Sequence, residues 1–141
     1  MTIKNSQETI LLTGAKGQLG KAIQEKLSSK YKIINLDLAY KENEIDSEHI
    51  NVNISDQNAV KNLFLSINPD IIINNAGISV FSNFLDRTSE QLDEVYDVNL
   101  KGTINMINEF AKQNTSNQKN KSIINIASLY GMISADPRIY T

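Results

Sequence analysis

Three glycines stand at intervals of three residues directly after the first apolar run of the chain, residues 9–13. Glycine allows backbone conformations with positive φ and has no Cβ that would hold a phosphate away from the chain. A helix that begins in such a turn offers N–H groups and the positive end of its dipole to an anion. A strand pattern precedes the turn and a helix pattern follows it, so we favour a pyrophosphate site over a tight turn with chance glycines. The residues of this turn are Gly14, Gly17, Gln18, Leu19 and Gly20.

An acid ends the second apolar run, residues 32–36, at a distance that fits the ribose of an adenosine. Asp37 follows Gly14 by about 20 residues, the separation typical of dinucleotide sites. A carboxylate there accepts hydrogen bonds from both ribose hydroxyls and repels a 2′-phosphate. An ordinary loop acid is the alternative, but the glycine turn before Asp37 favours the ribose role. The sequence therefore predicts NAD as the cofactor, in preference to NADP.

Two later turns follow apolar runs in the same way. Residues 74–77, with the sequence Asn-Asn-Ala-Gly, end the run 70–73, and Ser128 follows the run 122–127. Taken alone, the first is an Asn-rich turn and the second a turn serine. The glycine turn, Asp37, residues 74–77 and Ser128 nevertheless all stand at carboxyl ends of predicted parallel strands. That is one edge of one sheet, where open α/β sheets bind ligands.

Asn99 is a polar residue on an apolar helical stripe, four residues after Val95 and four before Thr103. A buried amide needs hydrogen-bond partners or it costs free energy. One interpretation is a partly exposed asparagine at the edge of the stripe. The other is a local break of the helix, where the amide binds a water or the active site. His49 is the single histidine, and no set of ligands around it predicts a metal site.

These residues need a frame of alternating strands and helices. Apolar runs predict five strands, at residues 9–13, 32–36, 49–53, 70–73 and 122–127. Helical spacing predicts a helix after Gly14, one capped by Ser55, and a long one over residues 88–112 that begins with a Thr88 and Gln91 capping box. Strands made almost wholly of Ile and Leu fit a sheet covered on both faces. The fold class is therefore α/β, with a doubly wound parallel sheet.

Composition excludes several classes of protein. Of the 141 residues, 40% are hydrophobic and 21% are charged, which is typical of a globular domain. The formal charge of −2 argues against a nucleic-acid partner, and the absence of cysteine excludes disulfides and thiolate metal sites. No segment has the roughly 20 apolar residues that a membrane span needs, and the polar start lacks a signal-peptide core. We expect a cytoplasmic protein with no membrane partner.

Together these motifs resemble the short-chain dehydrogenase/reductase family. The matching segments keep the family's order and are Thr13-Gly14-x-x-Gly17-x-x-Gly20, Asp37, Asn74-Asn75-Ala76-Gly77, Val98-Asn99-Leu100 and Ile126-Ala127-Ser128-Leu129-Tyr130-Gly131. The resemblance implies an NAD(P)-binding Rossmann fold with strand order 3-2-1-4-5. The family fold continues with two more strands after the fifth, and we expect these C-terminal strands to be missing here, which leaves the fifth strand as an unprotected edge. It also implies hydride transfer to or from a carbonyl or alcohol substrate.

The resemblance assigns roles to individual residues. Ser128 would hydrogen-bond the reacting oxygen of the substrate, and Asn99 would anchor a proton-relay water. Asn53 and Ile54 would flank the adenine, although the family usually has Asp at position 53. The cofactor cleft would also be lined by Asn75, Ala76 and Gly77.

The resemblance further implies a homo-oligomer that forms through the helix over residues 88–112. Three large side chains on this helix are candidates for the contact face. They are Tyr96, Met106 and Phe110.

Two features of the chain depart from the family pattern. The glycine spacing resembles the extended branch, with its nucleotide-sugar epimerases and dehydratases, but residues 74–77 and Asn99 resemble the classical branch, which we follow.

Tyr140 lies near the spacing of the family's Tyr-x-x-x-Lys, yet no lysine follows it before Thr141. We expect the catalytic pair beyond residues 1–141, which then form the dinucleotide-binding, N-terminal part of a longer domain. Tyr140 and the Pro137 segment become a substrate loop, for a sugar-linked alcohol as one candidate. A non-catalytic nucleotide-binding module or inactive fragment is the alternative.

Overall fold

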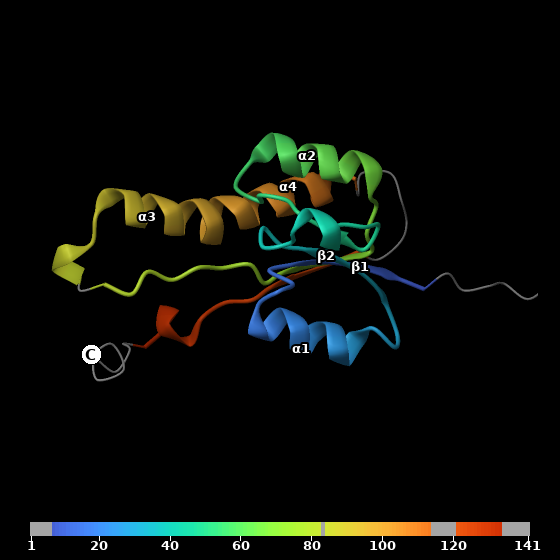
Figure 1. The fold of residues 1–141 in the computed structure, drawn as a ribbon, viewed down its shortest axis with the longest axis horizontal. Coiled ribbons are helices and arrows are strands. Elements are labelled where there is room, and N and C mark those ends of the chain that lie inside the picture. Colours follow the sequence, from blue (N-terminus) through green and yellow to red (C-terminus); the bar gives the residue numbers. More distant parts are fainter. Residues whose placement is uncertain (1–6, 83, 114–120, 134–141) are drawn as a thin grey trace, which may run out of the picture.

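A five-stranded parallel sheet forms the centre of the fold, with helices on both faces (Figure 1). The computed structural model describes residues 7–82, 84–113 and 121–133. The strand order is β3-β2-β1-β4-β5, and every neighbouring pair is parallel, as predicted. The strands are β1 (Thr9–Thr13), β2 (Lys32–Leu36), β3 (His49–Ile50), β4 (Ile71–Asn74) and β5 (Ser122–Asn125).

The helices lie where the apolar periodicity places them. In Figure 1, α1 covers one face of the sheet, while α2 and α4 cover the other. Their bounds are α1 (Gln18–Leu27), α2 (Gln57–Ser66), α3 (Ser89–Tyr96) and α4 (Thr103–Lys112), with a π-helical turn η3 (Asp97–Gly102) that joins α3 to α4. Short 3-10 turns complete the set and are η1 (Glu42–Glu44), η2 (Phe84–Asp86) and η4 (Leu129–Gly131).

Two apolar layers hold the helices against the sheet. Because successive strand residues face opposite sides, Leu11 packs under α2 and α4 while Ile10 and Leu12 pack over α1. Full burial of such a side chain contributes about 1.5–3 kcal/mol. Met106 and Phe110 of α4 are only 0% and 1% exposed, and they belong to the apolar layer that also contains Leu11. The prediction that these two residues form a contact face for a second copy was therefore wrong.

The helix starts show which caps the sequence specifies. Thr88 and Gln91 form the predicted capping box at the start of α3. At α2 the cap is Asp56, whose carboxylate accepts hydrogen bonds from Asn58 N at 2.8 Å and Ala59 N at 3.1 Å. The predicted cap, Ser55, instead donates its hydroxyl to the carbonyl of Asp97, at 2.8 Å. Asp and Ser cap equally well, and the carboxylate also favours the helix dipole.

Strand β5 forms the sheet edge that the sequence predicts. It pairs with β4, and all four of its residues are exposed in the described part of the chain. Ile123 and Ile124 point to opposite faces of the sheet and are 41% and 45% exposed. The expectation of a sheet covered on both faces therefore fails at β5, while it holds at β1.

Within the described residues, no helix has the length and apolar character needed to cross a membrane.

Candidate functional site

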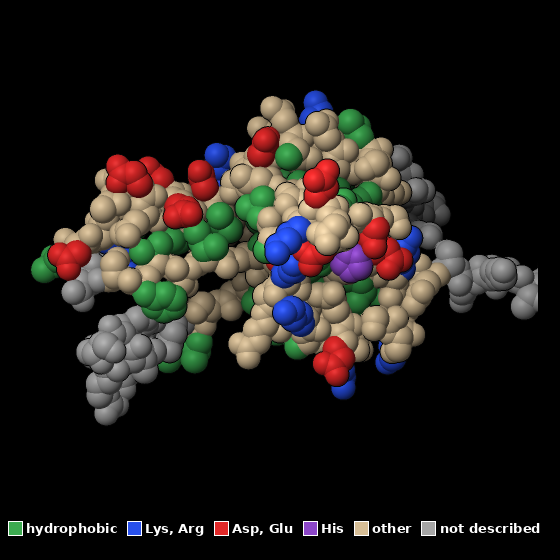
Figure 2. Space-filling model, in the orientation of Figure 1, with side chains coloured by type: hydrophobic (Ala, Val, Ile, Leu, Met, Phe, Trp, Pro, Cys, Tyr) green, Lys and Arg blue, Asp and Glu red, His purple; other side chains and the backbone are tan. Residues whose placement is uncertain are grey.

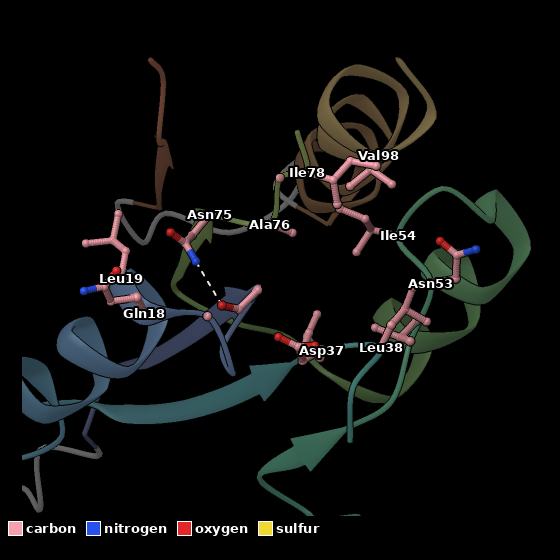
Figure 3. A pocket seen from close by; sticks show the side chains of 15 residues that line it. Gln18, Leu19, Asp37, Leu38, Asn53, Ile54, Asn75, Ala76, Ile78 and Val98 are labelled. Carbon is pink, nitrogen blue, oxygen red and sulfur yellow. Dashed lines mark hydrogen bonds between the residues drawn. The ribbon is translucent and has the colours of Figure 1, made fainter. Parts of the chain in front are cut away.

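The carboxyl ends of β1, β2, β3 and β4 surround a cleft of about 360 Å³ (Figure 3). All residues predicted to bind a cofactor line this cleft except Gly20. Figure 3 shows Gln18 and Leu19 on one side of the hollow and Asn53, Ile54 and Val98 on the other. The structure thus brings together turns that are far apart in the sequence, as the shared sheet edge predicts.

The glycine turn leaves the start of α1 open toward this cleft. Gly14 has a φ of +66°, and its carbonyl accepts a hydrogen bond from Gly17 N at 3.1 Å. Gly17 is the N-cap of α1, and no side chain caps the first turn. The N–H groups of that turn can therefore bind an anion. Gly20 does not line the cleft. A Cβ at Gly20 would overlap the Gly14 carbonyl oxygen, so a glycine at this position allows α1 to pack on the turn.

Thr13 and Asn75 fix the glycine turn to the turn after β4. The buried Thr13 hydroxyl accepts hydrogen bonds from Asn75 N at 3.0 Å and Ala76 N at 2.9 Å. The Asn75 amide donates to the carbonyls of Thr13, at 3.1 Å, and Gly14, at 3.0 Å, the second of which Figure 3 marks. The side-chain Nδ2 of Asn75 thus holds the two turns at a fixed separation. Asn75 also lines the cleft.

Asp37 presents a positioned carboxylate at the end of β2. Its Oδ2 accepts a hydrogen bond from Lys16 N and its Oδ1 accepts one from Ala39 N, both at 2.8 Å. The side chain also lines the cleft, where Figure 3 places it between the glycine turn and Leu38. Each carboxylate oxygen accepts more than one hydrogen bond, so the group can bind ligand hydroxyls as well.

The turn after β3 contributes Asn53 and Ile54 to the opposite side of the cleft. The Asn53 Oδ1 accepts a hydrogen bond from Ser55 N at 2.9 Å, which shapes the turn. The carbonyl of Ile54 accepts one from the buried Asn105 amide, also at 2.9 Å. The turn is therefore held from within and from α4.

Asn99 lies in the π-helical turn η3 and binds the segment after β4. Its Oδ1 accepts from Ile78 N at 2.8 Å, and its Nδ2 donates to Ile78 O at 2.9 Å. The local break of the helix is confirmed, while the exposure of Asn99 agrees with the other interpretation. A π turn adds a residue to the helical repeat, so the spacing from Val95 to Asn99 no longer marks one face. Asn99 itself does not line the cleft.

Ser128 lies beyond β5, in the exposed segment that leads into η4. Its carbonyl accepts a hydrogen bond from Gly131 N at 3.1 Å, and the residue does not line the cleft. Tyr140 and the Pro137 segment fall outside the described residues. The structure therefore joins the predicted cofactor residues other than Gly20 in one cleft and places the predicted catalytic residues outside its lining.

Five lining residues were not predicted from the sequence. All are apolar and sit at or just after strand ends or in η3, so nothing in their type separates them from the core. They are Leu36, Leu38, Val52, Ile78 and Val98.

Comparisons with known proteins agree with this arrangement. The family model of short chain dehydrogenases matches residues 8–138. A 3-oxoacyl-(acyl-carrier-protein) reductase of Staphylococcus aureus is 31% identical over 144 residues, which cover 89% of this chain and 58% of the reductase. The short chain dehydrogenase of Leptospira borgpetersenii with bound NAD+ is 36% identical with a TM-score of 0.85, over 99% of this chain and 60% of that one.

A further solved structure, from Agrobacterium tumefaciens and with bound NADP, is 26% identical, with a TM-score of 0.79. It covers 93% of this chain and 57% of its own. The chain thus spans a little over half the length of these three proteins. Of the two solved structures described above, one holds NAD+ and the other holds NADP.

Proposed function

The chain belongs to the short-chain dehydrogenase family, and from this premise we propose that it forms the dinucleotide-binding domain of an NAD-dependent oxidoreductase. One observation carries the proposal. The glycine turn, the open start of α1 and the Asp37 carboxylate line a single cleft. The relatives named above are a reductase and a dehydrogenase, so neither an epimerase nor a non-catalytic module is favoured.

The residues of the cleft fit a dinucleotide in chemical type. We assign the pyrophosphate to the uncapped first turn of α1, where Gly14 and Gly17 carry no Cβ and N–H groups are available. Asp37 would accept the hydroxyls of the adenosine ribose. When bound, the nicotinamide gives or takes the hydride. The adenine would lie between Asn53 and Ile54, and the remaining wall would consist of Asn75, Ala76 and Gly77.

We assign the catalytic contacts to Ser128 and Asn99. The Ser128 hydroxyl would donate a hydrogen bond to the oxygen of a small carbonyl or alcohol substrate, which gains negative charge as the reaction proceeds. Asn99 would anchor a proton-relay water through its backbone carbonyl, which also accepts a hydrogen bond from the Thr103 hydroxyl at 3.0 Å, because its side-chain amide is engaged with Ile78. A sugar-linked alcohol is one candidate substrate.

The cofactor assignment predicts a specific loss of discrimination in Asp37→Asn. Asparagine keeps the shape of the side chain but removes the charge that repels a 2′-phosphate. We expect the preference for NADH over NADPH to fall by about tenfold, the value of one charged hydrogen-bonding group. Fluorescence titration of the intact protein with both cofactors measures it.

Asp56→Asn is the matched control for this experiment. Asp56 also accepts two backbone N–H groups, but it caps α2 and does not line the cleft. Its substitution should leave the NADH to NADPH ratio unchanged. Tighter binding of NADPH by the wild-type protein would remove the role of Asp37, and a folded protein that binds neither cofactor would end the proposed function.

We also propose self-association through the helix that runs from α3 to α4. Four large apolar side chains on it are at least 40% exposed, namely Leu92, Tyr96, Leu100 and Ile104. Figure 2 shows hydrophobic side chains at the surface over α3 and the segment before it. Burying such a patch against a second copy is favourable.

A charge in this patch should therefore weaken the oligomer. We expect Leu100→Glu to shift the protein toward the monomer in analytical ultracentrifugation. Leu65→Glu is the control, because Leu65 is 78% exposed and belongs to another helix, α2. A wild-type protein that remains monomeric at high concentration contradicts the proposal.

A further inference from the structure

Lys16 stands beside the carboxylate that we assign to the adenosine ribose. Its backbone N–H donates to Asp37 Oδ2 at 2.8 Å, so the two residues are direct neighbours. A cation near the ribose 2′ position accommodates the phosphate of NADP, whereas a carboxylate there selects NAD. Lys16 and Asp37 therefore favour opposite cofactors, so the position of the Lys16 ammonium bears on how strong the preference set by Asp37 is.

The Lys16 ammonium is held by the turn between β2 and β3. Its Nζ lies 2.7 and 2.9 Å from the two carboxylate oxygens of Glu44, and 3.2 Å from the carbonyl of Ala39. It also lies 5.2 Å from the centre of the Tyr40 ring. Lys16 and Glu44 line a neighbouring pocket, and neither of them lines the dinucleotide cleft. The positive charge is thus directed away from the ribose site.

Glu44 is itself fixed in place by η1. Its Oε2 accepts a hydrogen bond from Lys41 N at 2.8 Å, which closes the capping box of that turn. The hydrogen bond from Lys16, together with the one from Lys41 N, holds the pKa of Glu44 below its ordinary value. The acid therefore stays charged at neutral pH, and the turn keeps it in position to bind Lys16.

We propose that Glu44 is a specificity-determining residue, which withdraws the Lys16 ammonium from the ribose site and so strengthens the preference for NAD. The inference rests on the proposed dinucleotide function. The ion pair is partly exposed, with side-chain exposures of 30% and 37%, so it can be broken at small cost. Without Glu44, the ammonium is free to turn toward a 2′-phosphate.

The test is a double-mutant cycle on the intact protein, titrated with NADH and NADPH. The variants are Glu44→Gln, Lys16→Met and the double substitution. Glutamine keeps an oxygen acceptor for Lys41 N and removes only the charge. We expect Glu44→Gln to lower the ratio of the NADPH to NADH dissociation constants about fivefold, the value of one exposed ion pair. In the Lys16→Met background the same change should alter the ratio less than about twofold, because the coupled partner is gone.

Each other outcome identifies what is wrong. If the wild-type protein prefers NADH and Glu44→Gln leaves the ratio unchanged, this inference is overturned and the proposed function stands. An equal drop with and without Lys16 means that Glu44 repels the phosphate directly, which overturns the part given to Lys16. If the folded wild-type protein binds neither cofactor, the proposed function fails, and this inference fails with it.

Discussion

Replacement of Ser128 by alanine is expected to lower turnover by about a hundredfold to a thousandfold while the affinity for NADH stays the same. The hydroxyl is proposed to donate to the substrate oxygen as that atom gains charge, and removing such a donor raises the barrier of the chemical step. The cofactor affinity should not change, because Ser128 does not line the dinucleotide cleft. The measurement is kcat of the intact protein, with the best substrate from a screen of ketones and nucleotide sugars, beside an NADH titration.

Ser122→Ala is the matched control for this prediction. Ser122 is an exposed serine at the start of β5, whereas Ser128 lies beyond the other end of that strand. Its substitution should leave both kcat and the NADH affinity unchanged. A Ser128→Ala enzyme with kcat within tenfold of the wild type, or one that loses NADH affinity in parallel, contradicts the role given to Ser128.

The second large effect is expected at Gly14. An alanine there must adopt a φ of +66°, and its Cβ would lie 2.8 Å from Ala76 Cα and 2.9 Å from Ala76 N. Positive φ alone costs a residue with a Cβ about 1–2 kcal/mol, and backbone atoms cannot yield as a flexible side chain can. We expect Gly14→Ala to lower the free energy of unfolding by about 2 kcal/mol or more and to weaken NADH binding at least about tenfold, since the two turns that line the cleft must separate.

Urea unfolding and NADH titration measure the two effects. Gly131→Ala is the control for stability, because a Cβ at Gly131 meets nothing within 4 Å. Its stability should stay within about 0.5 kcal/mol of the wild type, as for most surface substitutions. A Gly14→Ala protein that unfolds like the wild type and binds NADH normally would show that the turn has another conformation in solution.

Much of the fold follows from patterns that are local in the sequence. The Ile-rich and Leu-rich runs specify β1 and β2 because strands buried on both faces need apolar residues throughout. The position of a helix cap is harder to predict where two neighbouring residues can both cap. At the start of α2 the cap is Asp56 rather than Ser55. The third strand ends at Ile50 rather than at residue 53, because Ile50 pairs with Leu36, where its single neighbour β2 ends.

Only some of the residues that line the cleft could be predicted from the sequence, for physical reasons. Asp37 can be recognised because a charged residue at the end of an apolar strand differs from its neighbours. Val52 and Ile78 are apolar like core residues, so the sequence does not indicate that they line the cleft. The π turn at Asn99 changes the helical repeat, so a stripe drawn at α-helical spacing misplaces that residue. The ion pair of Lys16 with Glu44 depends on the path of a connecting turn, which no local pattern specifies.

The most direct test of the account is a crystal structure of the intact protein with NAD bound. The account predicts that the adenosine ribose hydroxyls lie within hydrogen-bond distance of the Asp37 carboxylate, with the pyrophosphate against the first turn of α1. The adenine should then lie on the side of the cleft formed by Asn53 and Ile54. A dinucleotide bound away from this cleft, or one whose ribose does not contact Asp37, would contradict it.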